Sequence, residues 1–205
     1  MPLTVEEYQR GQLFTTMEMS KQNTGGGEGV SVIKNEPFGP QDITKPFGDK
    51  FSAGQFTHKI YNFESRIPRF TRVFLPKGST KLHEKAWNCY PYCYTLVTNP
   101  DYMKDNFRIE IESIHLPDRG ENENALGLSE EELKNKVQDK MQSTYPRLFT
   151  KFHRDVFCYI DRWHPMSIDE VRLYEAQIKL ELDAKKNQGK TCGFTDTDEK
   201  KSCRT

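Results

Sequence analysis

One carboxylate in the last third of the chain stands where an apolar side chain is expected. Three apolar residues share a narrow arc of a helical wheel: Val171, Ile178 and Leu182. Glu175 lies inside the same arc, and burying it unpaired would cost several kcal/mol, so it must reach water, find a partner or be protonated. Leu173 and Leu180 on the opposite side suggest that both faces of this helix are covered. A surface helix whose Glu175 reaches water is an equal alternative.

A second candidate group lies on a strand-like segment at 55–63. There the alternation places Thr57 and Lys59 on one face with Tyr61 and Phe63. Taken alone, this pattern is more typical of an ordinary solvent-facing side. Asn88 is a polar residue in an aromatic stretch, and it fits equally a turn that precedes a proline. None of these residues specifies a function by itself.

Composition excludes several classes of partner. The chain has 30 basic residues (Lys and Arg) and 30 acidic residues (Asp and Glu), so its formal net charge is zero. This argues against nucleic acid as the main partner, because proteins that bind it have an excess of basic residues. The five cysteines form no C-x-x-C pair, and no histidine has zinc-finger spacing, so we expect no metal. No apolar stretch approaches the roughly 20 residues that span a bilayer, and the N-terminus has no signal-peptide pattern. We expect a cytoplasmic protein.

The order of elements predicts an α+β fold in a single domain over 1–205. Thr4 and Glu7 form a capping box that opens a helix to about Met19. Strands are predicted at 30–37, 55–63, 92–98 and 107–114, the last with one buried and one wet face. A helix is predicted from 129, and Pro146 interrupts or kinks it before an apolar stripe continues at 148–163. The capping box of Ser167 and Glu170 opens a last helix that reaches at least Leu182. Residues 185–205 are expected to be a polar tail.

Several long strings in this sequence resemble the phosphatidylinositol transfer proteins. They are NEPF (35–38), GQFTHKIY (54–61), HEKAWNCYPYC (83–93), VTNPDYMKDNF (97–107), RLFTKFHRDVFCYIDRW (147–163) and IDEVRLYE (168–175). The likeness covers most of 1–128 and 134–182 in family order, and THKIY and CYPYC favour the small alpha/beta type (class I).

The resemblance implies a START-like helix-grip fold, with a curved antiparallel sheet around a long C-terminal helix that encloses one phospholipid. The family's headgroup residues match Thr57, Lys59, Asn88 and Glu175 here. On this basis Glu175 accepts hydrogen bonds from inositol hydroxyls, and Lys59 reaches phosphate or ring oxygens.

Other family positions are also present. Cys93, Thr95 and Ser113 match headgroup-proximal positions, and Phe152 matches an aromatic residue near the bound lipid. Residues 66–78 match the lipid-exchange loop, whose basic and apolar residues suit an anionic interface: Arg69, Phe70, Arg72, Phe74 and Leu75. An ordinary amphipathic connector is the alternative.

Two family regions are missing from the sequence. The first strand is expected to be absent, and Leu133 passes directly to Lys134 where the family has several strands, a regulatory loop and a tandem-tryptophan docking loop. A shortened splice form or an incomplete gene model would each explain the gap.

The resemblance predicts a monomeric, non-enzymatic carrier without cofactors. Its cargo would be one phosphatidylinositol or phosphatidylcholine molecule, exchanged during transient contact with membrane surfaces. The alternative is a regulatory module that binds a partner and transfers lipid poorly. A cysteine hydrolase using Cys93 or Cys158 with His153 has no nucleophile motif to support it.

Overall fold

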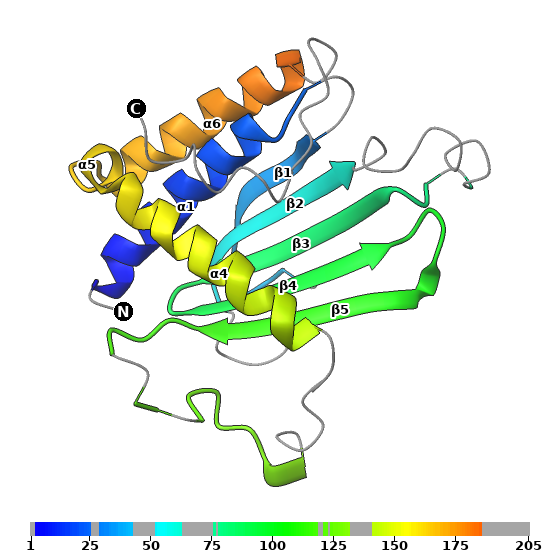
Figure 1. Cartoon of the computed structure of the whole chain (residues 1–205), viewed down its shortest axis with the longest axis horizontal. Coiled ribbons are helices and arrows are strands. Elements are labelled where there is room, and N and C mark those ends of the chain that lie inside the picture. The colour runs from blue at the N-terminus through cyan, green and yellow to red at the C-terminus, as the bar shows by residue number, and fades with distance from the viewer. Residues whose placement is uncertain are drawn as a thin grey trace.

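The computed structural model describes residues 3–25, 29–42, 52–62, 76, 78–118, 121–122, 124–131 and 141–185, without the side chains of 141–149. The elements in chain order are α1 (Val5–Gln22), β1 (Gly29–Phe38), β2 (Gly54–Asn62), β3 (Lys81–Cys89), β4 (Tyr92–Asn99), β5 (Lys104–Ile114), α4 (Met141–Cys158), α5 (Ile160–Trp163) and α6 (Ile168–Lys185). The predicted α+β class is confirmed, with the helix α6 at the C-terminal end (Figure 1).

The five strands form one antiparallel sheet in the order β1-β2-β3-β4-β5. Figure 1 shows the helices in front of one face of this sheet, with α1 and α6 side by side. We call this the inner face, since Val32 of β1 packs there against the core formed by Met17 of α1 and three residues of α6: Val171, Ile178 and Leu182. The predicted apolar arc of the last helix is therefore buried.

A second cluster lies on the opposite face of the sheet, which we call the outer face. Phe56 and Trp87 are cross-strand partners there, with ring centroids 5.0 Å apart. Phe38 and Cys89 complete the buried part of the cluster, and Tyr94 packs against it. The sheet is thus lined with apolar contacts on both sides, which fixes the register of its central strands.

The β3 strand was not predicted, because neither of its faces reads as apolar. Leu82, Glu84, Ala86 and Asn88 alternate with Lys81, His83, Lys85, Trp87 and Cys89, so charged or polar residues occur on both sides. Asn88 is a strand residue rather than a turn residue. The periodicity that identifies a half-buried strand is absent from such a segment.

Three other boundaries differ from the predictions. The first helix continues past Met19 to Gln22. The β1 strand passes through Pro37 instead of ending there, since it is an edge strand and a missing N–H need not break the ladder. The helix α4 also continues through Pro146, so of the two predicted effects of that residue, an interruption of the helix is wrong.

Both capping boxes that fall within the described residues are formed. Glu7 N donates to Thr4 Oγ1 over 3.1 Å, and Thr4 N donates to the Glu7 carboxylate over 2.8 Å. Ser167 N donates to Glu170 over 2.7 Å, and Glu170 N donates back to Ser167 Oγ over 3.2 Å. The first and last helices therefore begin where the sequence places them.

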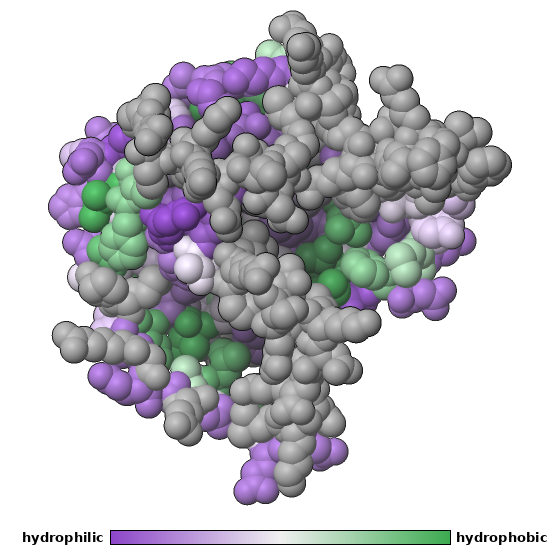
Figure 2. All heavy atoms as spheres, viewed as in Figure 1, coloured by the Kyte–Doolittle hydropathy of each residue, from purple (hydrophilic) through white to green (hydrophobic). Residues whose placement is uncertain are grey.

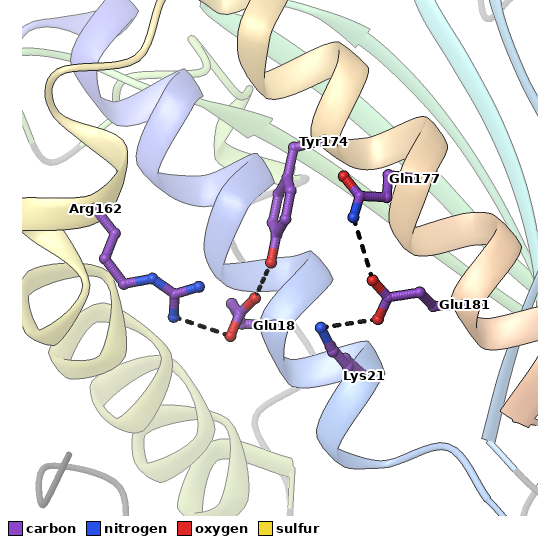
Figure 3. Close-up of polar contacts among 6 residues, drawn as sticks. All are labelled: Glu18, Lys21, Arg162, Tyr174, Gln177 and Glu181. Carbon is purple, nitrogen blue, oxygen red and sulfur yellow. Dashed lines mark hydrogen bonds and ion pairs between the residues drawn. The ribbon is translucent and has the colours of Figure 1, made fainter.

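A polar network joins α1 to the two C-terminal helices (Figure 3). Glu18 of α1 is 8% exposed; it pairs with Arg162 over 3.1 Å and accepts a hydrogen bond from the Tyr174 hydroxyl. At the rim of the same interface, Lys21 pairs with Glu181 over 2.8 Å. Arg162 also lies over the ring of Phe14, with its guanidinium carbon 4.8 Å from the ring centroid. These contacts position α6 against α1, and hence over the inner face.

Candidate functional site

The sheet residues predicted to surround the headgroup all lie on the inner face. Asn88 of β3 is opposite Cys93 of β4, which in turn is opposite Ser113 of β5. Ala86 joins Thr57 of β2 to Thr95 of β4 in the same way. Directly paired residues of antiparallel strands point to the same side, so these groups form one continuous polar patch among apolar neighbours. Lys59 belongs to the same side, two residues beyond Thr57.

These side chains are shielded to different degrees. Thr57 is 4% exposed and Cys93 is 5% exposed, whereas Asn88, Thr95 and Ser113 are half-buried. Burial, with a smaller effect from Cys89, raises the pKa of the Cys93 thiol to about 12. At neutral pH the thiol is protonated, and a protonated thiol is a poor nucleophile.

Lys59 already has an acidic partner in this structure. Its ammonium lies 3.6 Å from the carboxylate of Glu84, with the two side chains 15% and 22% exposed. The hydroxyl of Tyr61 donates to the same carboxylate over 2.9 Å, and burial together with Glu84 raises the pKa of Tyr61 well above its usual value. Glu84 was not predicted as a site residue, although its cross-strand position opposite Lys59 follows directly from the β2–β3 register.

Glu175 is also paired, but within its own helix. Its carboxylate accepts from Arg172 over 2.8 Å, and its side chain is 14% exposed. Of the three outcomes that the apolar arc left open, the structure shows a partner: an arginine three residues earlier, a spacing at which side chains on a helix meet. Leu173 and Leu180, which suggested a covered second face, are 72% and 71% exposed. That face of α6 is open in the described structure, so the predicted cover over these two leucines is wrong.

Tyr90 lies in the turn between β3 and β4, next to the strand ends that carry Asn88 and Cys93. Its hydroxyl donates to Gln12 of α1, and burial raises its pKa well above the usual value, with smaller contributions from Cys93, Tyr8 and Glu175. Glu175 and Cys93 are thus both within electrostatic range of one phenol. Among the described residues, no hydrogen bond or ion pair links Glu175 directly to the sheet residues of the predicted site.

Next to Tyr90 is a largely buried cluster of aromatic and imidazole rings that was not predicted from the sequence. The ring of His115 lies 4.8 Å from that of Tyr8 and 5.5 Å from that of Tyr90. The Tyr8 hydroxyl is 3.3 Å from Nε2 of His153. Burial, with a smaller effect from His153, lowers the pKa of His115 to about 4, so this imidazole is neutral at physiological pH.

The remaining predicted residues lie elsewhere. Phe152 of α4 packs against a core of Phe14, Val156 and Trp163, which joins α1 to α4 and α5. The exchange-loop residues Arg69, Phe70, Arg72, Phe74 and Leu75 fall outside the described residues, as do Leu133 and Lys134.

Two hollows lined by described residues are small or open. One of about 10 Å³ lies beside Tyr8 and His115, and an open depression of about 430 Å³ is lined by Ile160, Asp161, His164 and Pro165. Neither is lined by a predicted headgroup residue. Figure 2 shows green apolar side chains over the part of the sheet that the helices leave uncovered in this view. No helix in the described ranges is both long and apolar enough to cross a bilayer.

An open antiparallel sheet with a C-terminal helix over a partly polar inner face is an α+β lipid-binding fold. The sequence model for the family described as phosphatidylinositol transfer protein matches residues 1–137 and 133–180. This chain belongs to that family.

Curated relatives align along nearly the whole chain. The human phosphatidylinositol transfer protein beta isoform is 34% identical over 270 positions, covering 97% of this chain and 96% of the relative. Phosphatidylinositol transfer proteins 1 and 2 of Dictyostelium discoideum are each 32% identical, covering 90% and 93% of this chain. Because the human alignment spans 270 positions and this chain has 205 residues, at least 65 positions of that alignment have no residue here.

Proposed function

We propose that this chain binds phosphatidylinositol on the inner face of its sheet and exchanges it between membranes. The observation that carries the proposal is the register, which brings Thr57, Asn88, Cys93, Thr95 and Ser113 to one side of the sheet. Hydroxyl and amide groups at such positions suit a sugar headgroup, each contributing about 1 kcal/mol net in hydrogen bonds. The family supports a phosphatidylinositol lipid as cargo.

Lys59 and Glu175 are proposed as the charged members of this site. Both are less than a fifth exposed and both are held by a partner, Glu84 and Arg172 respectively. We propose that a bound headgroup takes part in these ion pairs, with phosphate oxygens sharing Lys59 and inositol hydroxyls donating to Glu175. Phosphatidylcholine, whose headgroup has no hydroxyls to donate, is a second proposed cargo that depends less on Glu175.

The test compares two lipids in one assay. Purified protein is loaded with labelled phosphatidylinositol or phosphatidylcholine, and transfer to acceptor vesicles is followed for the parent chain and for Glu175→Gln and Lys59→Ala. We expect phosphatidylinositol transfer to fall about tenfold in each variant, which equals about 1.4 kcal/mol. Phosphatidylcholine transfer should change little in Glu175→Gln, whereas it should also fall in Lys59→Ala, because both lipids carry the phosphate. Equal losses for both lipids in Glu175→Gln would show that the headgroup assignment is wrong.

The second candidate function is a partner-binding module that carries lipid poorly. It is favoured by the partial cover of the inner face, where Ile111 of β5 is 36% exposed. It is also supported by the family matches, 1–137 and 133–180, which meet near residues 133 and 134, where we propose that a block of family sequence is missing. Mass spectrometry of lipid that copurifies with the chain separates the two functions: one phospholipid per chain supports the carrier, and lipid-free protein supports the module.

The other proposed properties follow from the proposed role as a lipid carrier. We propose no enzymatic activity and no cofactor, since transfer makes and breaks no covalent bond. The chain is proposed to act in the cytoplasm and to touch membrane surfaces only during exchange, with residues 66–78 as the contacting loop.

A further inference from the structure

The last strand of the sheet has one open edge among the described residues. β5 pairs with β4 on one side, and no described strand pairs with its other side. Figure 1 shows it at the opposite end of the sheet from β1. The strand has 11 residues, and a long edge strand with unpaired N–H and C=O groups is a template for pairing with another chain.

The side chains of this edge are self-complementary. On the outer face Arg108 and Glu110 are 56% and 46% exposed and stand two residues apart. On the inner face Phe107, Ile109 and Ile111 form an apolar row, with Ile111 36% exposed. A strand with unlike charges two positions apart can pair with its own antiparallel copy so that each charge meets its opposite.

We propose that β5 is a self-association edge, at which two copies of this chain pair antiparallel about a two-fold axis through Ile109. In this register Arg108 lies opposite Glu110 of the second copy, and Glu110 lies opposite its Arg108. Ile109 lies opposite Ile109, and Phe107 opposite Ile111, so the apolar rows meet on the inner side. The two sheets become one continuous sheet.

The side chains select this register over its neighbours. A shift of the axis by one position in either direction sets Arg108 or Glu110 opposite its own copy, which places like charges together. A shift by two positions toward the C-terminus sets Glu110 opposite Glu112, and a shift by two toward the N-terminus sets Ile109 opposite Asp105. Like charges directly opposite each other are destabilising in antiparallel pairs.

The sequence led us to expect a monomer, and the open edge supplies a reason for a dimer. An interface built on one pair of strands is small, so the association is weak and dependent on concentration. Two copies joined in this way keep their inner faces on the same side of the combined sheet, which leaves the candidate lipid site of each chain in place.

Charge swaps test the register in solution. Sedimentation velocity over a range of protein concentrations should show a monomer–dimer equilibrium for the parent chain. Arg108→Glu or Glu110→Arg alone should raise the dissociation constant about tenfold, since two favourable cross-strand pairs become two repulsive ones. The double swap should restore the parent value. Glu112→Arg makes the same charge change opposite the neutral Asn106, and it should have little effect.

Cysteine cross-linking tests the axis itself. In a background with serine at Cys158, Cys192 and Cys203, Ile109→Cys should form a disulfide-linked dimer on mild oxidation, because opposite residues have Cβ atoms about 4.5–5.5 Å apart. Phe107→Cys should not, because its two copies are four positions apart along the strands, about 13 Å. A parent chain that stays monomeric at every concentration, or equal cross-linking at 107 and 109, would overturn the proposal.

Discussion

The ion pair between Lys59 and Glu84 gives the sharpest test of the candidate site. If Lys59 meets lipid phosphate, Glu84 competes with that phosphate for the same ammonium. The two groups are 3.6 Å apart, and at an effective dielectric constant of 20 their attraction is about 4.5 kcal/mol before the cost of desolvation. Partly buried pairs return most of that attraction as desolvation, so the net strength is about 1 kcal/mol.

The perturbation is Glu84→Gln. It removes the charge but keeps an oxygen that can accept from the Tyr61 hydroxyl, which donates to Glu84 over 2.9 Å. Removing about 1 kcal/mol of competition should tighten phosphatidylinositol binding about fivefold. The assay is equilibrium partition of a fluorescent phosphatidylinositol between vesicles and protein.

A double-mutant cycle with Lys59→Ala supplies the control. In the Lys59→Ala background, Glu84→Gln should leave phosphatidylinositol binding unchanged, because there is no ammonium to release. A fivefold gain that persists without Lys59 would mean that Glu84 acts on the lipid directly. Weaker binding by Glu84→Gln alone would mean that the carboxylate itself contacts the headgroup. Either result refutes the competition that we infer from the geometry.

Three further predictions concern the scaffold that holds the site. In a denaturant titration, Glu18→Gln should lower the free energy of unfolding by about 2–3 kcal/mol, because it breaks the buried network of Figure 3. The control is Glu181→Gln at the exposed rim of that interface, which should lower it by under about 0.5 kcal/mol. Gly11→Ala should cost about 1–3 kcal/mol, since an added Cβ would lie 2.9 Å from the indole of the α5 tryptophan, while Gly39→Ala meets no atom within 4 Å and should be nearly neutral. The pKa of His115 is lowered to about 4 in the folded chain, so its contribution to the free energy of unfolding is full above about pH 6.5. As the pH falls, the unfolded state takes up a proton first, and about 2 kcal/mol is lost at pH 5. His115→Gln should remove this part of the pH dependence, and an unchanged pH profile in that variant would contradict the prediction.

Much of the fold could be predicted from local patterns. The capping boxes located the first and last helices because a capping residue and its partner are only three positions apart. The alternation of β5 located that strand. β3 was missed because its environment is set by β2 and β4, and a central strand with charges on both faces leaves no period-two signal.

The candidate site shows the same limit at the level of single side chains. The arc around Glu175 predicted that this carboxylate must reach water, find a partner or be protonated, and the structure shows Arg172 as its partner. The partner of Lys59 was missed because Glu84 is 25 residues away in sequence and becomes its neighbour only through the β2–β3 register. Long-range pairing of this kind cannot be read from spacing along one strand, and it determines which charges are free to meet a ligand.

The balance between headgroup and acyl chains decides whether this chain carries lipid efficiently. Each buried methylene is worth about 0.8 kcal/mol, so a diacyl lipid with roughly 30 methylenes gains about 25 kcal/mol in a bilayer. A carrier must bury nearly the same apolar area, whereas each polar contact at the headgroup contributes only about 1–3 kcal/mol. The inner face offers polar groups for selection, but Ile111 at its β5 end is 36% exposed. We therefore expect slower transfer than by the human beta isoform in the same vesicle assay. Equal rates would mean that segments outside the described residues complete the apolar enclosure.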